Sequence, residues 1–325
     1  MMDIKHQRIL KFVQGTVSVC LVVILLFSVG IDSLGSVIRQ IRIVWLPVIL
    51  ATVLFPMFLG AFNIWILLNS QAKITFNKFF QAYIHAYATG LIIPGQIGDV
   101  SLALFLRSNK ISVYHSGVAY LIDKTISLFI GVSLGLVGLH HYFSGNYISL
   151  NVSNSIGIIF VFSIILGIIG FAILKKFLFS RTSLLRTFWG RFVWYIKRVY
   201  SSFRVYFSYW HLIVLNALLS LLKWCIVIAS FILAFAAVGV KVQILDGALV
   251  PIMASLVGYL PISIGGVGPV EITAGYIFGL INIKLSSVIA VYAILRTLQF
   301  LLTGISVLVV KLIFNKKFSE IDAIG

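Results

Sequence analysis

The chain is poor in acidic residues and in cysteine. Of its 325 residues only eight are Asp or Glu, against 25 Lys and Arg, and charged residues of both signs make up 10%. The two cysteines, Cys20 and Cys225, both lie in apolar segments, so no disulfide framework is predicted. The adjacent His140 and His141 have no Cys, Asp or Glu at metal-ligand spacing and are typical of a membrane rim. We therefore expect no metal site and no cofactor.

Hydrophobic residues, by contrast, make up 61% of the sequence. Several apolar runs are longer than the roughly 18–20 residues that are needed to cross a bilayer. A soluble domain does not need apolar runs of this length. We predict an all-helical polytopic membrane protein with one membrane domain over 1–325. The first run has a basic start like that of a signal peptide but lacks a small-residue cleavage site, so we expect it to remain as a span. The six predicted spans lie near 12–30, 43–69, 112–139, 155–174, 212–238 and 285–311.

The net charge of +17 is unevenly distributed along the chain. Two further apolar stretches, about 78–107 and 243–280, are interrupted near their middles. We assume that each of them enters and leaves the membrane on the same side. With a cytoplasmic N-terminus, 18 bases then fall on the cytoplasmic side and only Arg39, Arg42, Lys241 and Lys284 outside. The positive-inside rule favours this orientation. We expect both termini in the cytoplasm, a location in the inner membrane and no nucleic-acid partner, and the oligomeric state stays open.

The two interrupted stretches carry the same unusual segment, 172 positions apart. The first reads Gly90-Leu-Ile-Ile-Pro-Gly-Gln-Ile-Gly-Asp99 and the second Gly258-Tyr-Leu-Pro-Ile-Ser-Ile-Gly-Gly-Val-Gly-Pro-Val-Glu271. Each breaks an apolar helix with Gly and Pro and ends on an acid. At the same offset Lys124 matches Arg296, and two tyrosines match two others, Tyr87 with Tyr259 and Tyr120 with Tyr292. The breaks are assigned to Pro94, Gly95, Gly98, Pro261, Gly265, Gly266 and Gly268.

A helix broken inside hydrocarbon exposes unpaired backbone groups, so such breaks are shielded by other helices or line a polar cavity. The alternative is an ordinary kinked span, since Gly and Pro are common in membrane helices. Two matching breaks favour re-entrant hairpins. The first hairpin is predicted to enter from the cytoplasm and the second from outside. The chain would then contain two inverted repeats, about 43–140 and 212–314, which is the arrangement that surrounds a transport site near the bilayer midplane.

Six charged side chains lie at predicted membrane depth, and their charges sum to zero. They are Asp99, Asp123, Lys124, Lys223, Glu271 and Arg296. A charge at the bilayer centre costs about 2.5–3.5 kcal/mol, so these residues are expected to face the protein interior. Asp99 and Glu271 follow the breaks, near the start of the returning half-helices, where the helix dipole favours an anion. Lys223 has no counterpart in the first half, and its long side chain can also snorkel.

Three interpretations of these charges remain open. The acids and bases could be structural salt bridges that hold each hairpin to its span. The bases could bind a lipid phosphate, bidentately by Arg296 and as a point charge by Lys124, while the acids neutralise them in the empty site. Alternatively, the acids could carry protons that drive exchange. Nearby polar side chains are candidates for the same cavity: Gln96, Ser101, Ser263, Thr273 and Gln299.

Between the repeats, a linker over about 175–211 carries eight bases and no acid, interleaved with aromatic residues. This pattern is typical of an amphipathic helix on an anionic membrane surface, although an ordinary positive-inside loop has the same composition. The residues assigned to this surface are Arg186, Arg191, Lys197, Arg198 and Arg204.

The two broken segments resemble those of the flippase-like family of the lysylphosphatidylglycerol synthase transmembrane region. The resemblance covers about residues 10–315 and is strongest at Pro94–Asp99, with Arg107 behind it, and at Leu260–Glu271. Asp123 and Lys124 stand where the family has an acid–base pair, but Lys replaces the more usual Arg, and Ser127 stands where a later Asp is usual.

The resemblance implies movement of a lipid between leaflets, and the expected partners are anionic phospholipids or polyprenyl phosphate-linked glycans. The family's aminoacyl-transferring members carry a soluble catalytic domain after the membrane region, so we expect no enzymatic activity here. The alternative is an accessory subunit of a membrane glycosyltransferase or of an envelope-lipid synthesis complex. The candidate lipid-binding residues are Gln96, Asp99, Asp123, Lys124, Glu271, Arg296 and Gln299.

Overall fold

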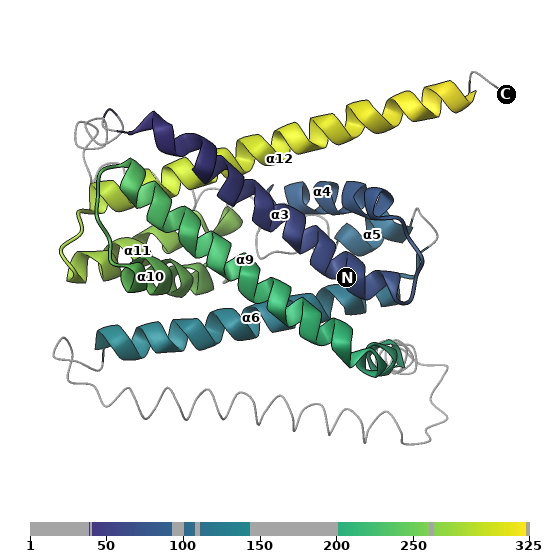
Figure 1. Cartoon of the computed structure of the whole chain (residues 1–325), viewed down its shortest axis with the longest axis horizontal. Coiled ribbons are helices and arrows are strands. Elements are labelled where there is room, and N and C mark those ends of the chain that lie inside the picture. The colour runs from purple at the N-terminus through teal and green to yellow at the C-terminus, as the bar shows by residue number, and fades with distance from the viewer. Residues whose placement is uncertain are drawn as a thin grey trace, which may run out of the picture.

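The computed structural model describes residues 39, 41–92, 101–107, 111–143, 201–259 and 263–322. These ranges form a bundle of helices and contain no strand (Figure 1). The all-helical prediction is confirmed for this part of the chain. The predicted spans 12–30 and 155–174 lie outside it.

Four long helices form the frame of the bundle, and each is long and apolar enough to cross a membrane. They coincide with the predicted spans at 43–69, 112–139, 212–238 and 285–311. Large apolar side chains such as Leu218, Leu301 and Leu308 remain exposed on them, as lipid-facing surfaces require. A short 3₁₀ turn, Ile43–Trp45, precedes the first. The helices are α3 (Leu46–Asn69), α6 (Val113–Phe143), α9 (Trp210–Ala237) and α12 (Leu285–Asp322).

Each interrupted apolar stretch forms two shorter helices that pack against each other. The first stretch contains α4 (Phe76–Ile92) and α5 (Ser101–Arg107). The second contains α10 (Ile244–Val257) and α11 (Pro269–Leu280), with a 3₁₀ turn, Ile264–Gly266, between them. Both stretches are therefore helical on either side of the predicted interruption, and their entry and exit on one side of a membrane stays a prediction. Pro94, Gly95, Gly98 and Pro261 lie outside the described residues.

The two halves of the chain have the same order of elements and run in opposite directions. Helix α6 begins at Val113 and α12 at Leu285, 172 positions later, which is the offset of the sequence repeat. Figure 1 shows α6 and α12 on opposite sides of the bundle, with their chains running in opposite senses. The pair α4–α5 lies at one end of the bundle and the pair α10–α11 at the other. This arrangement matches the predicted inverted repeats.

Helices of one repeat pack against helices of the other, so the two repeats do not form separate bodies. Helix α4 packs against α12 of the second repeat, α10 packs against α6 of the first, and α3 crosses α9. Glycines in α6 permit the approach of α10: a Cβ at Gly135 would lie 2.6 Å from Leu256 Cδ1, and one at Gly138 would lie 2.5 Å from Met253 Sδ. Small residues at such interfaces are typical of packing in membranes.

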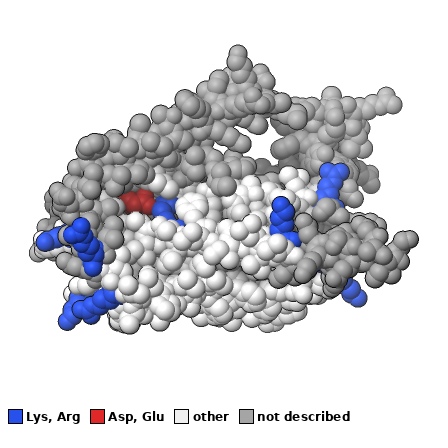
Figure 2. All heavy atoms as spheres, turned by 90° about the horizontal axis from the view of Figure 1, so that it is seen from above, with Lys and Arg blue, Asp and Glu red and all other residues white. Residues whose placement is uncertain are grey.

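The charged residues of the described surface lie mainly toward the two ends of the molecule. Figure 2 shows Lys and Arg gathered there, while most of the described surface between them is uncharged. The bundle has two hydrophobic clusters, one built mainly on the second repeat and one mainly on the first, and residues of both line a cavity that also carries charged side chains.

Candidate functional site

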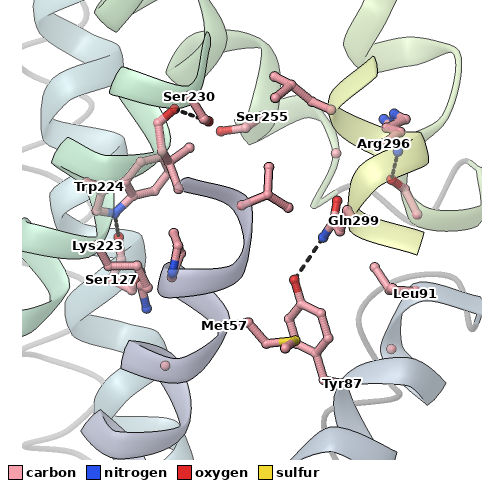
Figure 3. A pocket seen from close by; sticks show the side chains of 18 of the residues that line it. Met57, Tyr87, Leu91, Ser127, Lys223, Trp224, Ser230, Ser255, Arg296 and Gln299 are labelled. Carbon is pink, nitrogen blue, oxygen red and sulfur yellow. Dashed lines mark hydrogen bonds between the residues drawn. The ribbon is translucent and has the colours of Figure 1, made fainter. Parts of the chain in front are cut away.

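The cavity has a volume of about 490 Å³ and is lined by both repeats. Its walls come from α3, α4, α5 and α6 of the first repeat and from α9, α10, α11 and α12 of the second. Figure 3 shows Lys223 and Ser127 on one side of it, with Arg296 and Gln299 on another. The charged residues of the described lining are Asp123, Lys124, Lys223 and Arg296, so cations outnumber the anion.

Arg296 is held at the cavity wall by the second hairpin. Its Nε donates to Glu271 Oε1 at 2.5 Å, and its Nη1 donates to the carbonyl oxygen of Gly265 at 3.0 Å. The Arg296 side chain is 23% exposed and the Glu271 side chain 8%. This contact agrees with the structural salt-bridge interpretation and equally with an acid that neutralises Arg296 in an empty site. Since Arg has five N–H donors, it keeps donors for a further acceptor.

Glu271 also forms a hydrogen bond that caps the start of α11. Its Oε2 accepts a hydrogen bond from the backbone N–H of Gly268 at 2.7 Å. A Glu three residues into a helix commonly binds back to the N-cap in this way, and the helix dipole stabilises its negative charge there. Glu271 thus lies behind Arg296 and fixes both the helix start and the guanidinium.

The glycines of the second break are required by the path of the chain. Gly265, Gly266 and Gly268 have φ angles of 59°, 72° and 96°, a region that other residues rarely adopt. A Cβ on Gly266 would lie 2.9 Å from the Cα of Gly258. This turn brings the Gly265 carbonyl to Arg296, and a Cβ at Gly265 would lie 3.3 Å from the carbonyl oxygen of Leu91 in the first hairpin.

Asp123 is held at the point where α6 meets the crossing of α3 and α9. Its Oδ1 accepts hydrogen bonds from Asn63 Nδ2 at 2.7 Å and from Asn216 Nδ2 at 3.2 Å. Each asparagine also donates to the other's backbone carbonyl at 3.2 Å, and Asn63 reaches Ser220 Oγ at 2.9 Å. The four residues are at most 4% exposed. Asp123 is therefore paired with amides and makes no ion pair with a described residue.

The two lysines of the cavity have different surroundings. The Lys124 ammonium lies 5.7 Å from the ring centre of Tyr120 and 5.9 Å from that of Tyr259, so a tyrosine from each repeat flanks it. Such contacts attract a cation to the ring face. Lys223, on α9, lines the cavity and makes no hydrogen bond or ion pair within the described part of the chain. Its charge is available to a ligand.

Two further polar side chains line the cavity from α12. Gln299 Nε2 donates to the hydroxyl of Tyr87 on α4 at 2.8 Å, which links the repeats (Figure 3). The Tyr292 hydroxyl is buried and has no hydrogen-bond partner among the described residues. Leaving a buried hydroxyl without a hydrogen-bond partner costs free energy unless another group supplies the hydrogen bond.

The predicted site residues are thus only partly brought together. Lys124, Arg296, Asp123 and Gln299 line one cavity, and Glu271 supports it from behind. Thr273 instead bonds the backbone of Pro269 at 2.8 Å, and Ser263 is buried. Arg204 is exposed on the helical segment 201–208. Six predicted residues lie outside the described ranges: Gln96, Asp99, Arg186, Arg191, Lys197 and Arg198.

Sequence reasoning missed Asn63, Asn216 and Ser220. All three interrupt apolar spans, and a polar amide at membrane depth is a signal that could have found the two asparagines. Tyr292 appeared only as half of a repeat identity. Lys223 could not be assigned because the offset of 172 places Ala51 at its equivalent position.

The described bundle is that of an integral membrane protein with a charged cavity between inverted repeats. The family model described as lysylphosphatidylglycerol synthase transmembrane region matches residues 11–306. The chain belongs to this family, which relates it to lipid handling. Comparison with curated proteins gives no match, and comparison with solved structures gives none.

Proposed function

We propose that the protein moves a lipid with an anionic or phosphate-linked headgroup between the two leaflets, through the cavity between its repeats. The observation that carries this proposal is the charge of the cavity wall. Within the described lining there are three bases, Lys124, Lys223 and Arg296, and a single acid, Asp123. A headgroup that leaves water needs such partners, because a bare charge in the bilayer interior costs several kcal/mol.

The size of the cavity and the free donors in its wall support an anionic headgroup. A volume of about 490 Å³ lies within the usual range of small-ligand pockets, so a headgroup fits while the acyl or prenyl chains stay in lipid. Arg296 keeps unused N–H groups, and Lys223 has no hydrogen-bond or ion-pair partner among the described residues. Phosphate oxygens accept from both kinds of donor.

The inverted arrangement supports movement across the membrane. In transporters built from inverted repeats, the site lies at the repeat interface, and access alternates by motion of one repeat against the other. Here side-chain hydrogen bonds, such as that of Tyr87 with Gln299, and apolar packing between helices link the repeats around the cavity. The protein itself would carry out no group transfer, and membrane lipids would be its cargo.

Purified protein in liposomes tests the proposal. Headgroup-labelled phosphatidylglycerol and a short-chain polyprenyl phosphate are each placed in the inner leaflet, and their appearance outside is followed with an impermeant quencher or enzyme. Movement of either lipid above that of protein-free liposomes supports translocation and identifies the preferred headgroup. Folded wild-type protein that moves neither lipid would contradict the proposal. The Arg296→Ala variant serves as the first control.

A further inference from the structure

Asp123 is a buried carboxylate at the cavity wall that no base neutralises among the described residues. It is 4% exposed, and its Oδ1 accepts from Asn63 and Asn216. Within the described ranges no donor reaches its second oxygen, Oδ2. Removing one negative charge from water without a counter-ion is strongly unfavourable, so the site calls for a positive partner.

The same cluster holds two further oxygens without partners. Asn63 and Asn216 are each 1% exposed, and their side-chain oxygens accept no hydrogen bond from a described residue. These oxygens belong to the same amide groups that donate to Asp123, so they lie beside its carboxylate. Buried acceptors left unsatisfied cost free energy. A carboxylate and amide oxygens are also the groups that hard cations take as ligands.

We propose that Asp123, Asn63 and Asn216 form a binding site for a small monovalent metal cation, Na⁺, and that its occupancy is coupled to lipid movement. The coupling, but not the site, rests on the proposed function. A single carboxylate is neutralised by one positive charge, which favours a monovalent ion over a divalent one. The asparagines position the acid and provide the remaining oxygens.

The location explains how the cation and the lipid would act together. Asp123 shares the cavity with the anionic headgroup, and these two negative groups would compete for the Lys and Arg side chains of the cavity. A cation bound at Asp123 removes that competing negative charge, so cation and headgroup favour each other's binding, reciprocally. The site also ties α6 to the crossing of α3 and α9, where the two repeats meet.

Several charged and phenolic groups share the cavity with Asp123, so a response of the whole protein to Na⁺ does not by itself identify the site. On α6 these are Tyr120 and Lys124, on α9 Lys223, and at the end of α10 Tyr259; all line the same cavity. The test therefore relies on a variant that removes only the carboxylate. Asp123→Asn keeps an oxygen at the same place but cannot hold a charge.

Thermal unfolding of the full chain in detergent measures the site without requiring transport. A ligand that binds only the folded protein raises its midpoint with concentration. Replacing K⁺ by Na⁺ at constant ionic strength and pH should raise the wild-type midpoint. This response should be absent in Asp123→Asn and present in Asp246→Asn. Asp246 is a matched control because it is also buried and hydrogen-bonded, to Tyr142, away from this cluster.

A Na⁺ dependence that is the same in wild type and Asp123→Asn would overturn the site. If Asp123→Asn does not fold, Asn216→Ser replaces it, since this variant retains the acid and removes one donor and one amide oxygen. It should raise the Na⁺ concentration at half-effect about tenfold, the usual scale for loss of a supporting group around a bound ion. An unchanged half-effect concentration would also overturn the site.

Coupling is then measured in liposomes with an imposed Na⁺ gradient. This gradient should accelerate lipid movement in wild type and in Asp246→Asn, but not in Asp123→Asn. Lipid movement that does not respond to the Na⁺ gradient in wild type would overturn the coupling. No lipid movement in any condition, with the cation-dependent midpoint intact, would refute the proposed function and leave the cation site standing.

Discussion

Glu271 binds Arg296 with one carboxylate oxygen and caps helix α11 with the other. Its Oε1 accepts from Arg296 Nε at 2.5 Å, and its Oε2 accepts from the backbone N–H of Gly268 at 2.7 Å. One side chain therefore fixes both the start of the returning half-helix and the direction of the cavity's guanidinium.

Because the two roles use different properties of Glu271, two substitutions should separate them. Gln can still accept the Gly268 N–H but offers no charge to Arg296, so Glu271→Gln should lower the free energy of unfolding by about 1.5–3 kcal/mol. Ala also removes the cap, which should add about 1 kcal/mol. Thermal unfolding in detergent should rank wild type above Gln and Gln above Ala. Equal stability of the two variants would show that the cap contributes nothing.

The hydrogen bond between Gln299 and Tyr87 should couple the two repeats energetically. Tyr87→Phe and Gln299→Met each remove one partner of this 2.8 Å contact while largely keeping its volume. A double-mutant cycle in unfolding free energy should give a coupling of about 0.6 kcal/mol, the average for side-chain hydrogen bonds within a membrane. Strict additivity of the two substitutions would mean that the contact does not stabilise the interface between repeats.

Two glycines of the second hairpin should respond oppositely to alanine. Gly266 has a φ of 72°, and its new Cβ would lie 2.9 Å from the Cα of Gly258, so Gly266→Ala should lower the unfolding temperature. Gly279 lies within α11 with no atom within 4 Å of an added Cβ. Gly279→Ala should be neutral or stabilise by up to about 1 kcal/mol. Equal effects of both would contradict the described path of the break.

The positions of the long helices could be predicted because a membrane span needs an uninterrupted apolar run. The spans predicted at 43–69 and 212–238 differ from the described Ile43–Asn69 and Trp210–Ala237 by at most a few residues. The offset of 172 also predicted the element order of the second repeat from the first. A salt bridge between Glu271 and Arg296 could be included among the predicted alternatives because acids and bases at membrane depth commonly pair, although Asp123 makes no ion pair with a described residue.

The contacts of Asp123 could not be predicted in the same way. Its partners Asn63 and Asn216 are separated from it by 60 and 93 positions and meet it only where α3 and α9 cross. No periodicity in the sequence fixes that crossing. Neither asparagine has an asparagine at the repeat offset, so the internal symmetry that located the hairpins gave no indication of this cluster.

The charge of Lys223 offers the most direct test of the account. Lys223→Met keeps an apolar stem and removes from the cavity a cation that has no ion-pair partner among the described residues, while Lys284→Met removes one exposed cation outside it. Loss of a charge-assisted contact of about 1.5–3 kcal/mol corresponds to roughly 10-fold or more in binding. Lipid movement in liposomes at limiting lipid concentration should fall by about that factor in Lys223→Met and stay unchanged in Lys284→Met. Equal rates for Lys223→Met and wild type would contradict an anionic headgroup in this cavity.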